Sequence, residues 1–229
     1  MLSRFPSCYK SLNLTLYAVM AFEFALALAY LATSFKWGRS PEVLDFNGLA
    51  SLPSWFQAAH LFSIGAIASG LLMVRRYTER PLSWMLLILL VLISLSAGLH
   101  ELTKLYIPLP LLSWKRLYFI YVVAIVTLCW QDLITIWRSH RQSVLWIFSG
   151  FGFIALGGYG LNSIQDELAP VLASSLNHDS IFYVYPMLVA IEEWSEMFGE
   201  TLIVFGICIL AFDNLRKLRD PDKAIGAER

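Results

Sequence analysis

Six long apolar stretches dominate this chain of 229 residues. They cover roughly residues 12–34, 55–75, 83–103, 113–137, 143–163 and 187–212. A helix of about 20 apolar residues is long enough to cross the roughly 30 Å hydrocarbon core of a bilayer. We therefore predict an all-α integral membrane protein, with a single polytopic membrane domain over residues 1–229 built as a bundle of six transmembrane helices.

Composition excludes the main soluble classes. The chain is 58% hydrophobic and 15% charged, whereas soluble domains are typically ~45–50% apolar and ~25% charged. A water-soluble chain of this length could not bury so much apolar surface. The formal net charge is zero, so no basic patch indicates a nucleic-acid partner. The expected partner is the lipid bilayer.

The distribution of basic residues predicts the orientation. If the N-terminus is inside, 12 of the 17 Lys and Arg residues fall in inner segments. The last outer loop, 164–186, has no Lys or Arg but carries Asp166, Glu167 and Asp179. By the positive-inside rule, both termini are expected in the cytoplasm and the chain in a plasma (inner) membrane. The apolar connections 105–114 and 168–186 are expected to lie in the outer interface.

Four glutamates in the sixth stretch form the strongest polar signal. At 100° per residue, Glu192, Glu193, Glu196 and Glu200 share one sector of about 100°. An acidic residue at the centre of a bilayer costs a few kcal/mol, so these side chains should face the bundle interior or a bound cation. Glu196 and Glu200 lie one turn apart, so either a cation lies between them or one carries a proton. We expect these four glutamates to form an ion or proton site, with Glu196 and Glu200 at its core.

Further ionisable side chains lie at a similar depth in other stretches. His60 and His100 are comparably far below the outer ends of the second and third spans, Glu101 follows His100, and Glu23 is mid-span in the first. Imidazoles and carboxylates carry protons and bind divalent metals. Glu23 is therefore expected to join the ion or proton site. His60, His100 and Glu101 are candidate ligands of a divalent metal ion, with the two imidazoles converging.

Other polar or small residues have simpler interpretations. Asp132 lies near the inner end of the fourth span and is expected to be structural. His140 is expected to be solvated in a loop. The glycine-rich sequence SGFGFIALGGYG of the fifth span predicts a close-packing helix surface. Such a surface could also hold a homo- or hetero-oligomer together.

Three classes of function remain open on the sequence alone, and so does the question of enzymatic activity. The leading hypothesis is a small or ion-coupled transporter whose outward-facing Glu/His site handles protons or cations. The first alternative is a membrane enzyme whose divalent metal activates water against a lipid-linked substrate. The second is a non-catalytic accessory subunit or a membrane-acting effector, in which Lys104, Lys115 or Arg116 would neutralise the glutamates.

Overall fold

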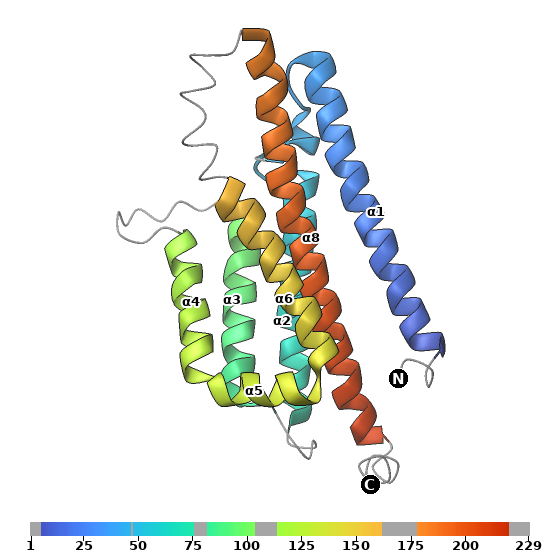
Figure 1. Ribbon diagram of the computed structural model, residues 1–229, viewed down its shortest axis with the longest axis vertical. Helices are drawn as coiled ribbons and strands as arrows, with labels where there is room; N and C mark the ends of the chain where they lie inside the picture. Colours follow the sequence, from blue (N-terminus) through green and yellow to red (C-terminus); the bar gives the residue numbers. More distant parts are fainter. Residues whose placement is uncertain (1–5, 47, 76–81, 104–113, 162–177, 220–229) are drawn as a thin grey trace.

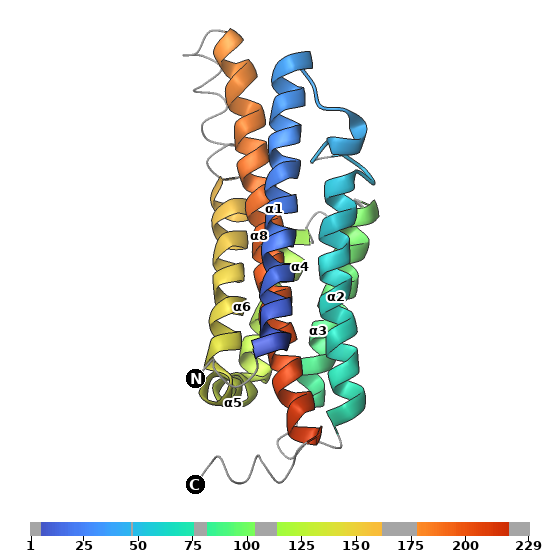
Figure 2. The same ribbon diagram turned by 90° about the vertical axis from the view of Figure 1, so that its right-hand side faces the viewer.

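The computed structural model describes residues 6–46, 48–75, 82–103, 114–161 and 178–219. Within these ranges every regular element is a helix, which confirms the all-α prediction. The helices run along one long axis except α5, which lies across one end of the bundle (Figure 1). The start of α1 and the end of α8 lie at that same end (Figures 1 and 2).

Four of the predicted spans correspond to long helices: α1 Pro6–Trp37, α2 Leu52–Val74, α3 Trp84–Thr103 and α8 His178–Arg219. Each contains a segment long and apolar enough to cross a membrane. Helix α8 has 42 residues, or about 63 Å at 1.5 Å per residue. We expected residues 168–186 to be a connection between two spans, but residues 178–186 form the first turns of α8. Pro186 lies inside this helix. Residues 168–177 and 104–113 lie outside the described residues.

The fourth predicted span, 113–137, is not one helix. The chain forms α4 Trp114–Leu128 and α5 Trp130–Ser139, and the pair is bent by 77° at Cys129. Cys129 is buried at this corner in an apolar cluster with Leu86, Ile136, Val144 and Leu210. The 15 residues of α4 extend about 22 Å, which is shorter than a bilayer core. In the described residues, length and composition support four crossing helices, or five if the bent pair counts as one.

The glycine-rich fifth span packs closely against α8. It forms α6 Arg141–Ile154 and continues as a π-helical segment, Ala155–Leu161. A Cβ on Gly150 would lie 2.4 Å from the carbonyl oxygen of Gly199, and one on Gly157 would lie 2.5 Å from Cβ of Ser195. These contacts confirm the predicted close-packing surface. Because Gly150 and Gly157 face α8 of the same chain, they do not offer this surface to another chain.

The connection between α1 and α2 fixes the height of α2. Gly38, with a φ of 74°, ends α1, and its N–H donates to the Ser34 carbonyl at 2.9 Å. The Phe46 side chain is fully buried and packs edge-on against Tyr30, with ring centroids 4.9 Å apart. Ser51 then caps α2 by accepting a hydrogen bond from the Ser54 N–H. The following turns of α2 are therefore held at a defined level beside α1.

Helix α8 is the central element and lies beside α1, α2 and α6 (Figure 2). Two apolar clusters pack α1 against α8. One lies toward the α1–α2 connection and includes Leu26, Tyr30, Val189 and Met197. The other lies toward the start of α1 and includes Leu16, Leu202, Phe205 and Ile209. Glu23 lies between these two clusters along α1, so its height relative to α8 is fixed from both sides.

Candidate functional site

Three helices bring ionisable side chains together in the interior of the bundle. Glu23 comes from α1, His60 from α2 and Glu200 from α8, with Thr201 next to Glu200. Their exposed fractions are 0% for Glu23, 9% for His60, 8% for Glu200 and 4% for Thr201. We call these four residues the buried cluster. Three of its members were predicted as site residues, and the structure unites them from three separate spans.

The Thr201 hydroxyl bridges two ionisable groups. It donates a hydrogen bond to Oε1 of Glu23, and its oxygen lies 3.2 Å from Nε2 of His60. A hydroxyl has one proton to donate and lone pairs to accept with. When Glu23 is ionised, the hydroxyl proton points to Glu23, so Nε2 of His60 is the donor in its contact with Thr201. In that state the imidazole carries its proton on Nε2.

The other ring nitrogen of His60 faces two carboxylates. Its Nδ1 lies 3.8 Å from Oε2 of Glu200 and 4.0 Å from Oε1 of Glu23. Among the described residues, three buried atoms of the cluster have no hydrogen-bond partner: Nδ1 of His60, Oε2 of Glu23 and Oε2 of Glu200. All three atoms are acceptors when both glutamates are ionised and the neutral imidazole carries its proton on Nε2. Burying unpaired acceptors is unfavourable, so that charge state would be stabilised by a proton or another positive group.

No stronger base neutralises the cluster within the described part of the chain. His60 is the only basic side chain there that lies within ion-pair distance of Glu23 or Glu200. Glu200 instead lies within electrostatic reach of four other carboxylates, those of Glu23, Glu101, Glu193 and Glu196. The side chains of Lys104, Lys115 and Arg116, proposed as neutralising partners, lie outside the described residues. The local field at Glu200 therefore favours positive charge.

The four glutamates of the predicted stripe do not have equal environments. Glu200 is buried in the cluster, whereas Glu192, Glu193 and Glu196 are half-buried. Oε2 of Glu193 accepts a hydrogen bond from Nε2 of Gln57 at 3.3 Å. We expected Glu196 and Glu200 to form the core. In the structure Nδ1 of His60, from α2, lies 3.8 Å from Oε2 of Glu200, while Glu196 acts on Glu200 through its charge.

His100 of α3 and His60 of α2 lie at the same height along the bundle, but their side chains point in different directions. A Cβ on Gly98 of α3 would lie 2.7 Å from the Phe62 ring of α2, and one on Gly65 would lie 3.4 Å from Ser94. This antiparallel register sets residue 100 opposite residue 60. However, His100 lies about 200° around α3 from Gly98, and His60 points toward α1 and α8. The arrangement does not favour a ligand shared by the two imidazoles.

The residues predicted as metal ligands, His60, His100 and Glu101, do not form a recognisable metal centre. In the ranges that the structure describes, no group of three or more His, Cys, Asp or Glu side chains is placed to hold a metal ion. His60 belongs to the buried cluster and Glu101 lies within electrostatic reach of Glu200. Of the three residues predicted as metal ligands, His60 and Glu101 are therefore both near enough to act electrostatically on Glu200.

Sequence reasoning missed two features. Thr201 lies about 100° around α8 from Glu200, outside the sector of the four glutamates, and a hydroxyl in an apolar helix is a weak signal. His140 was expected to be solvated, but its side chain is 8% exposed and its Nδ1 lies 3.3 Å from Oδ2 of Asp213. That pair joins the corner between α5 and α6 to α8.

Asp132, which was expected to be structural, lies in the first turn of α5.

Comparison with protein-family models, with curated proteins and with solved structures found no match to this chain.

Proposed function

We propose that this chain is an integral membrane protein that transfers protons through the buried cluster. The hydroxyl of Thr201, which contacts both Glu23 and His60, is the observation that carries the proposal. In the proposed orientation, the start of α1 and the end of α8 lie on the cytoplasmic side of an inner membrane. His60 is the ninth residue of α2, about 12 Å from the outer end of that helix. The cluster then lies in the outer half of the bundle.

The proposed transfer moves one proton from Glu200 through His60 and Thr201 to Glu23. In the starting arrangement Glu200 is protonated, His60 carries its proton on Nε2, and the Thr201 hydroxyl donates to the Glu23 carboxylate. Glu200 gives its proton to Nδ1 of His60. The imidazole gives its Nε2 proton to the Thr201 oxygen, and Thr201 gives its own proton to Glu23. One proton has then moved from Glu200 to Glu23, and the imidazole and the hydroxyl each keep one.

The donor–acceptor distances along this path are not equally suited to proton transfer. The distance of 3.2 Å between Thr201 and His60 is within hydrogen-bond range. The distance of 3.8 Å between Nδ1 of His60 and Glu200 is longer than a hydrogen bond. Transfer at the Glu200 end therefore needs a bridging water or a small movement of the ring. This step is the natural point of control, because its donor and acceptor are the farthest apart along the proposed path.

Proton flux into liposomes tests the proposal. Purified protein is reconstituted with an entrapped pH-sensitive dye, and an inward-directed potential is set with potassium and valinomycin. We expect flux above that of protein-free liposomes, and we expect it to fall at least about tenfold in Glu23→Gln and in Glu200→Gln. Asp132→Asn, a carboxylate change outside the cluster, is the matched control and should retain flux.

Two results would overturn the proposal: wild-type flux equal to that of empty liposomes, or full flux in both glutamine variants. Either result would favour the accessory-subunit alternative, in which the cluster is structural. Metal content measured on the same preparation addresses the other alternative. A bound divalent ion that is lost in Glu200→Gln would favour the metal-dependent enzyme.

A further inference from the structure

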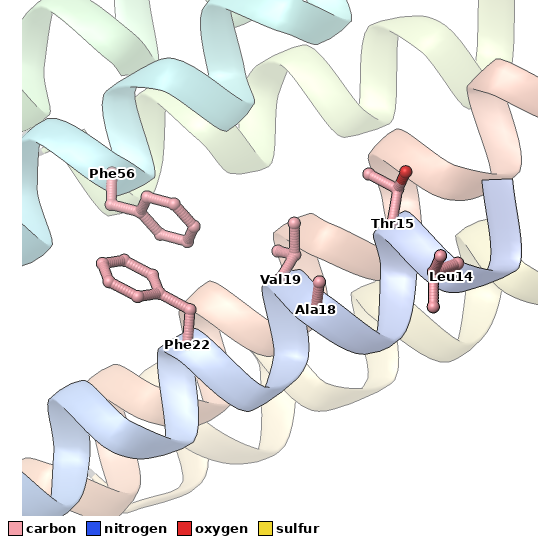
Figure 3. Close-up of a pocket in the computed structure, with 6 residues that line it drawn as sticks. All are labelled: Leu14, Thr15, Ala18, Val19, Phe22 and Phe56. Carbon is pink, nitrogen blue, oxygen red and sulfur yellow. The ribbon is translucent and has the colours of Figure 1, made fainter. Parts of the chain in front are cut away.

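An apolar groove between α1 and α2 leads toward the buried cluster. It has a volume of about 420 Å³ and is lined by Leu14, Thr15, Ala18, Val19 and Phe22 of α1 and by Phe56 of α2 (Figure 3). Its volume lies in the range of sites that hold small organic molecules. The Thr15 hydroxyl donates to the Ser11 carbonyl at 3.1 Å, so it is already satisfied within α1. The groove therefore suits an apolar body.

Two aromatic rings separate this groove from the cluster. Phe22 and Phe56 point toward each other with ring centroids 5.0 Å apart (Figure 3). The Phe56 ring also packs edge-on against the His60 ring, with ring centroids 4.5 Å apart. Nδ1 of His60 lies 4.0 Å from Oε1 of Glu23. The end of the groove is thus joined to the buried Glu23 carboxylate through the rings of Phe56 and His60.

The charge behind these rings indicates the kind of molecule that fits. Oε2 of Glu23 and Oε2 of Glu200 are buried acceptors with no hydrogen-bond partner in the described residues. Within that part of the chain, neither carboxylate has a Lys or Arg at ion-pair distance. Aromatic faces attract cations within about 6 Å. A positive group placed at Phe22 and Phe56 would therefore be attracted by the rings and, when they are ionised, by the carboxylates on the far side of His60.

We propose that the groove binds a lipophilic cation, with its apolar body along α1 and its positive group at the Phe22–Phe56 pair. This proposal rests on the proposed proton function in one respect, because the carboxylates that would attract the cation are those that take part in proton transfer. An uncharged acyl chain would fill the groove equally well but would leave the carboxylates uncompensated. A neutral occupant is therefore an outcome of the test.

The test measures equilibrium binding of three probes to the full chain in nanodiscs, with protein-free nanodiscs subtracted. The probes are tetraphenylphosphonium, the anion of the same shape, tetraphenylborate, and neutral triphenylphosphine oxide. We expect the cation to bind at least about tenfold more tightly than either other probe. Glu23→Gln should weaken cation binding at least about tenfold and leave the neutral probe unchanged.

Two tryptophan variants keep the test independent of folding at the buried carboxylate. Ala18 is exposed and lines the groove, so Ala18→Trp should fill it and weaken cation binding at least about tenfold. Ala25 is exposed on the same helix and does not line the groove, so Ala25→Trp should bind normally. Equal binding of all three probes, or cation binding that Ala18→Trp or Glu23→Gln leaves unchanged, would overturn the proposal.

Binding and flux separate the two proposals. Glu23-dependent cation binding without proton flux would retain the binding site and reject the proton-transfer function. Proton flux without cation binding would retain the transfer function and reject the lipophilic cation.

Discussion

Two histidine–carboxylate contacts in this protein have different chemical settings. At the corner of α5 and α6, His140 meets Asp213 at 3.3 Å. In the interior, His60 faces two carboxylates at 3.8 and 4.0 Å and a hydroxyl at 3.2 Å. The first contact joins one ring nitrogen to one carboxylate and ties two elements together. The second has more acceptors than protons, so its protons can be distributed in more than one way.

This difference shows why burial of a histidine beside an acid does not by itself indicate function. A close pair with matched donor and acceptor stabilises one arrangement of the chain. A cluster with surplus acceptors at longer distances can hold a proton on several atoms. We therefore assign proton transfer to the His60 cluster and a structural role to the His140–Asp213 pair. The following predictions test that division from the largest expected effect to the smallest.

The two histidines should respond very differently to the same substitution. His60→Asn removes the group that connects Glu200 to Thr201, and loss of a proton-transferring side chain typically costs about 10²-fold or more in rate. We expect proton flux to fall by about that factor. His140→Asn should retain at least about half of the wild-type flux, because His140 is outside the transfer path. Equal losses in the two variants would contradict the division between the two contacts.

Thr201 offers a sharper test, because its hydroxyl can be removed with little change in shape. A hydrogen bond to a charged group contributes about 1.5–3 kcal/mol, and 1.4 kcal/mol is a tenfold change. Thr201→Val should therefore lower proton flux by about tenfold or more. Thr201→Ser keeps the hydroxyl and should retain most of the flux. If serine and valine behave alike, the hydroxyl is not part of the transfer path.

Two glycines of α8 test whether the spacing of the helices matters more at the cluster. A Cβ on Gly199 would lie 2.5 Å from the Gly150 carbonyl oxygen, and one on Gly206 would lie 2.7 Å from the Ser143 carbonyl oxygen. Both alanine substitutions should push α8 away from α6 and lower thermal stability. Gly199→Ala displaces the neighbouring Glu200 and should lower proton flux by about fivefold, since small misplacements of reacting groups are costly. Gly206→Ala should lower flux less than Gly199→Ala does.

The sequence named Glu23, His60 and Glu200 as candidates, because ionisable residues are rare in apolar spans and therefore informative, but it did not separate them from the other candidates, Glu192, Glu193, Glu196, His100 and Glu101. Thr201 could not be found in the same way. Threonine hydroxyls in helices commonly bond to their own backbone, as Thr33 does to Ala29 and Thr127 does to Val123. Only the packing of α1 against α8 brings the Thr201 hydroxyl to Glu23.

The break at Cys129 could not be predicted from apolar content. Residues 113–137 are apolar enough for a span, and no proline or glycine occurs near the corner. In α5, however, Trp130 and Trp137 are exposed on one side, while Gln131 and Arg138 are exposed on another. Separate apolar and polar exposed sides are typical of a helix lying in a membrane interface. Hydropathy averaged along the sequence does not separate these sides, so it indicated a crossing helix.

The smallest effect on flux is expected at Asp213, where stability should change instead. The His140 side chain is 8% exposed and that of Asp213 is 33% exposed, so solvent weakens their attraction. Asp213→Asn should destabilise the chain by about 1 kcal/mol, which for a protein of this size lowers the midpoint of thermal unfolding by about 2–4 °C. Tryptophan fluorescence during heating in detergent measures this shift, and the liposome assay should show flux close to that of the wild type. A large loss of flux with unchanged stability would instead place Asp213 on a proton path at the end of the bundle where α1 begins and α8 ends. The two histidine–carboxylate contacts would then be consecutive steps of one proton-transfer path.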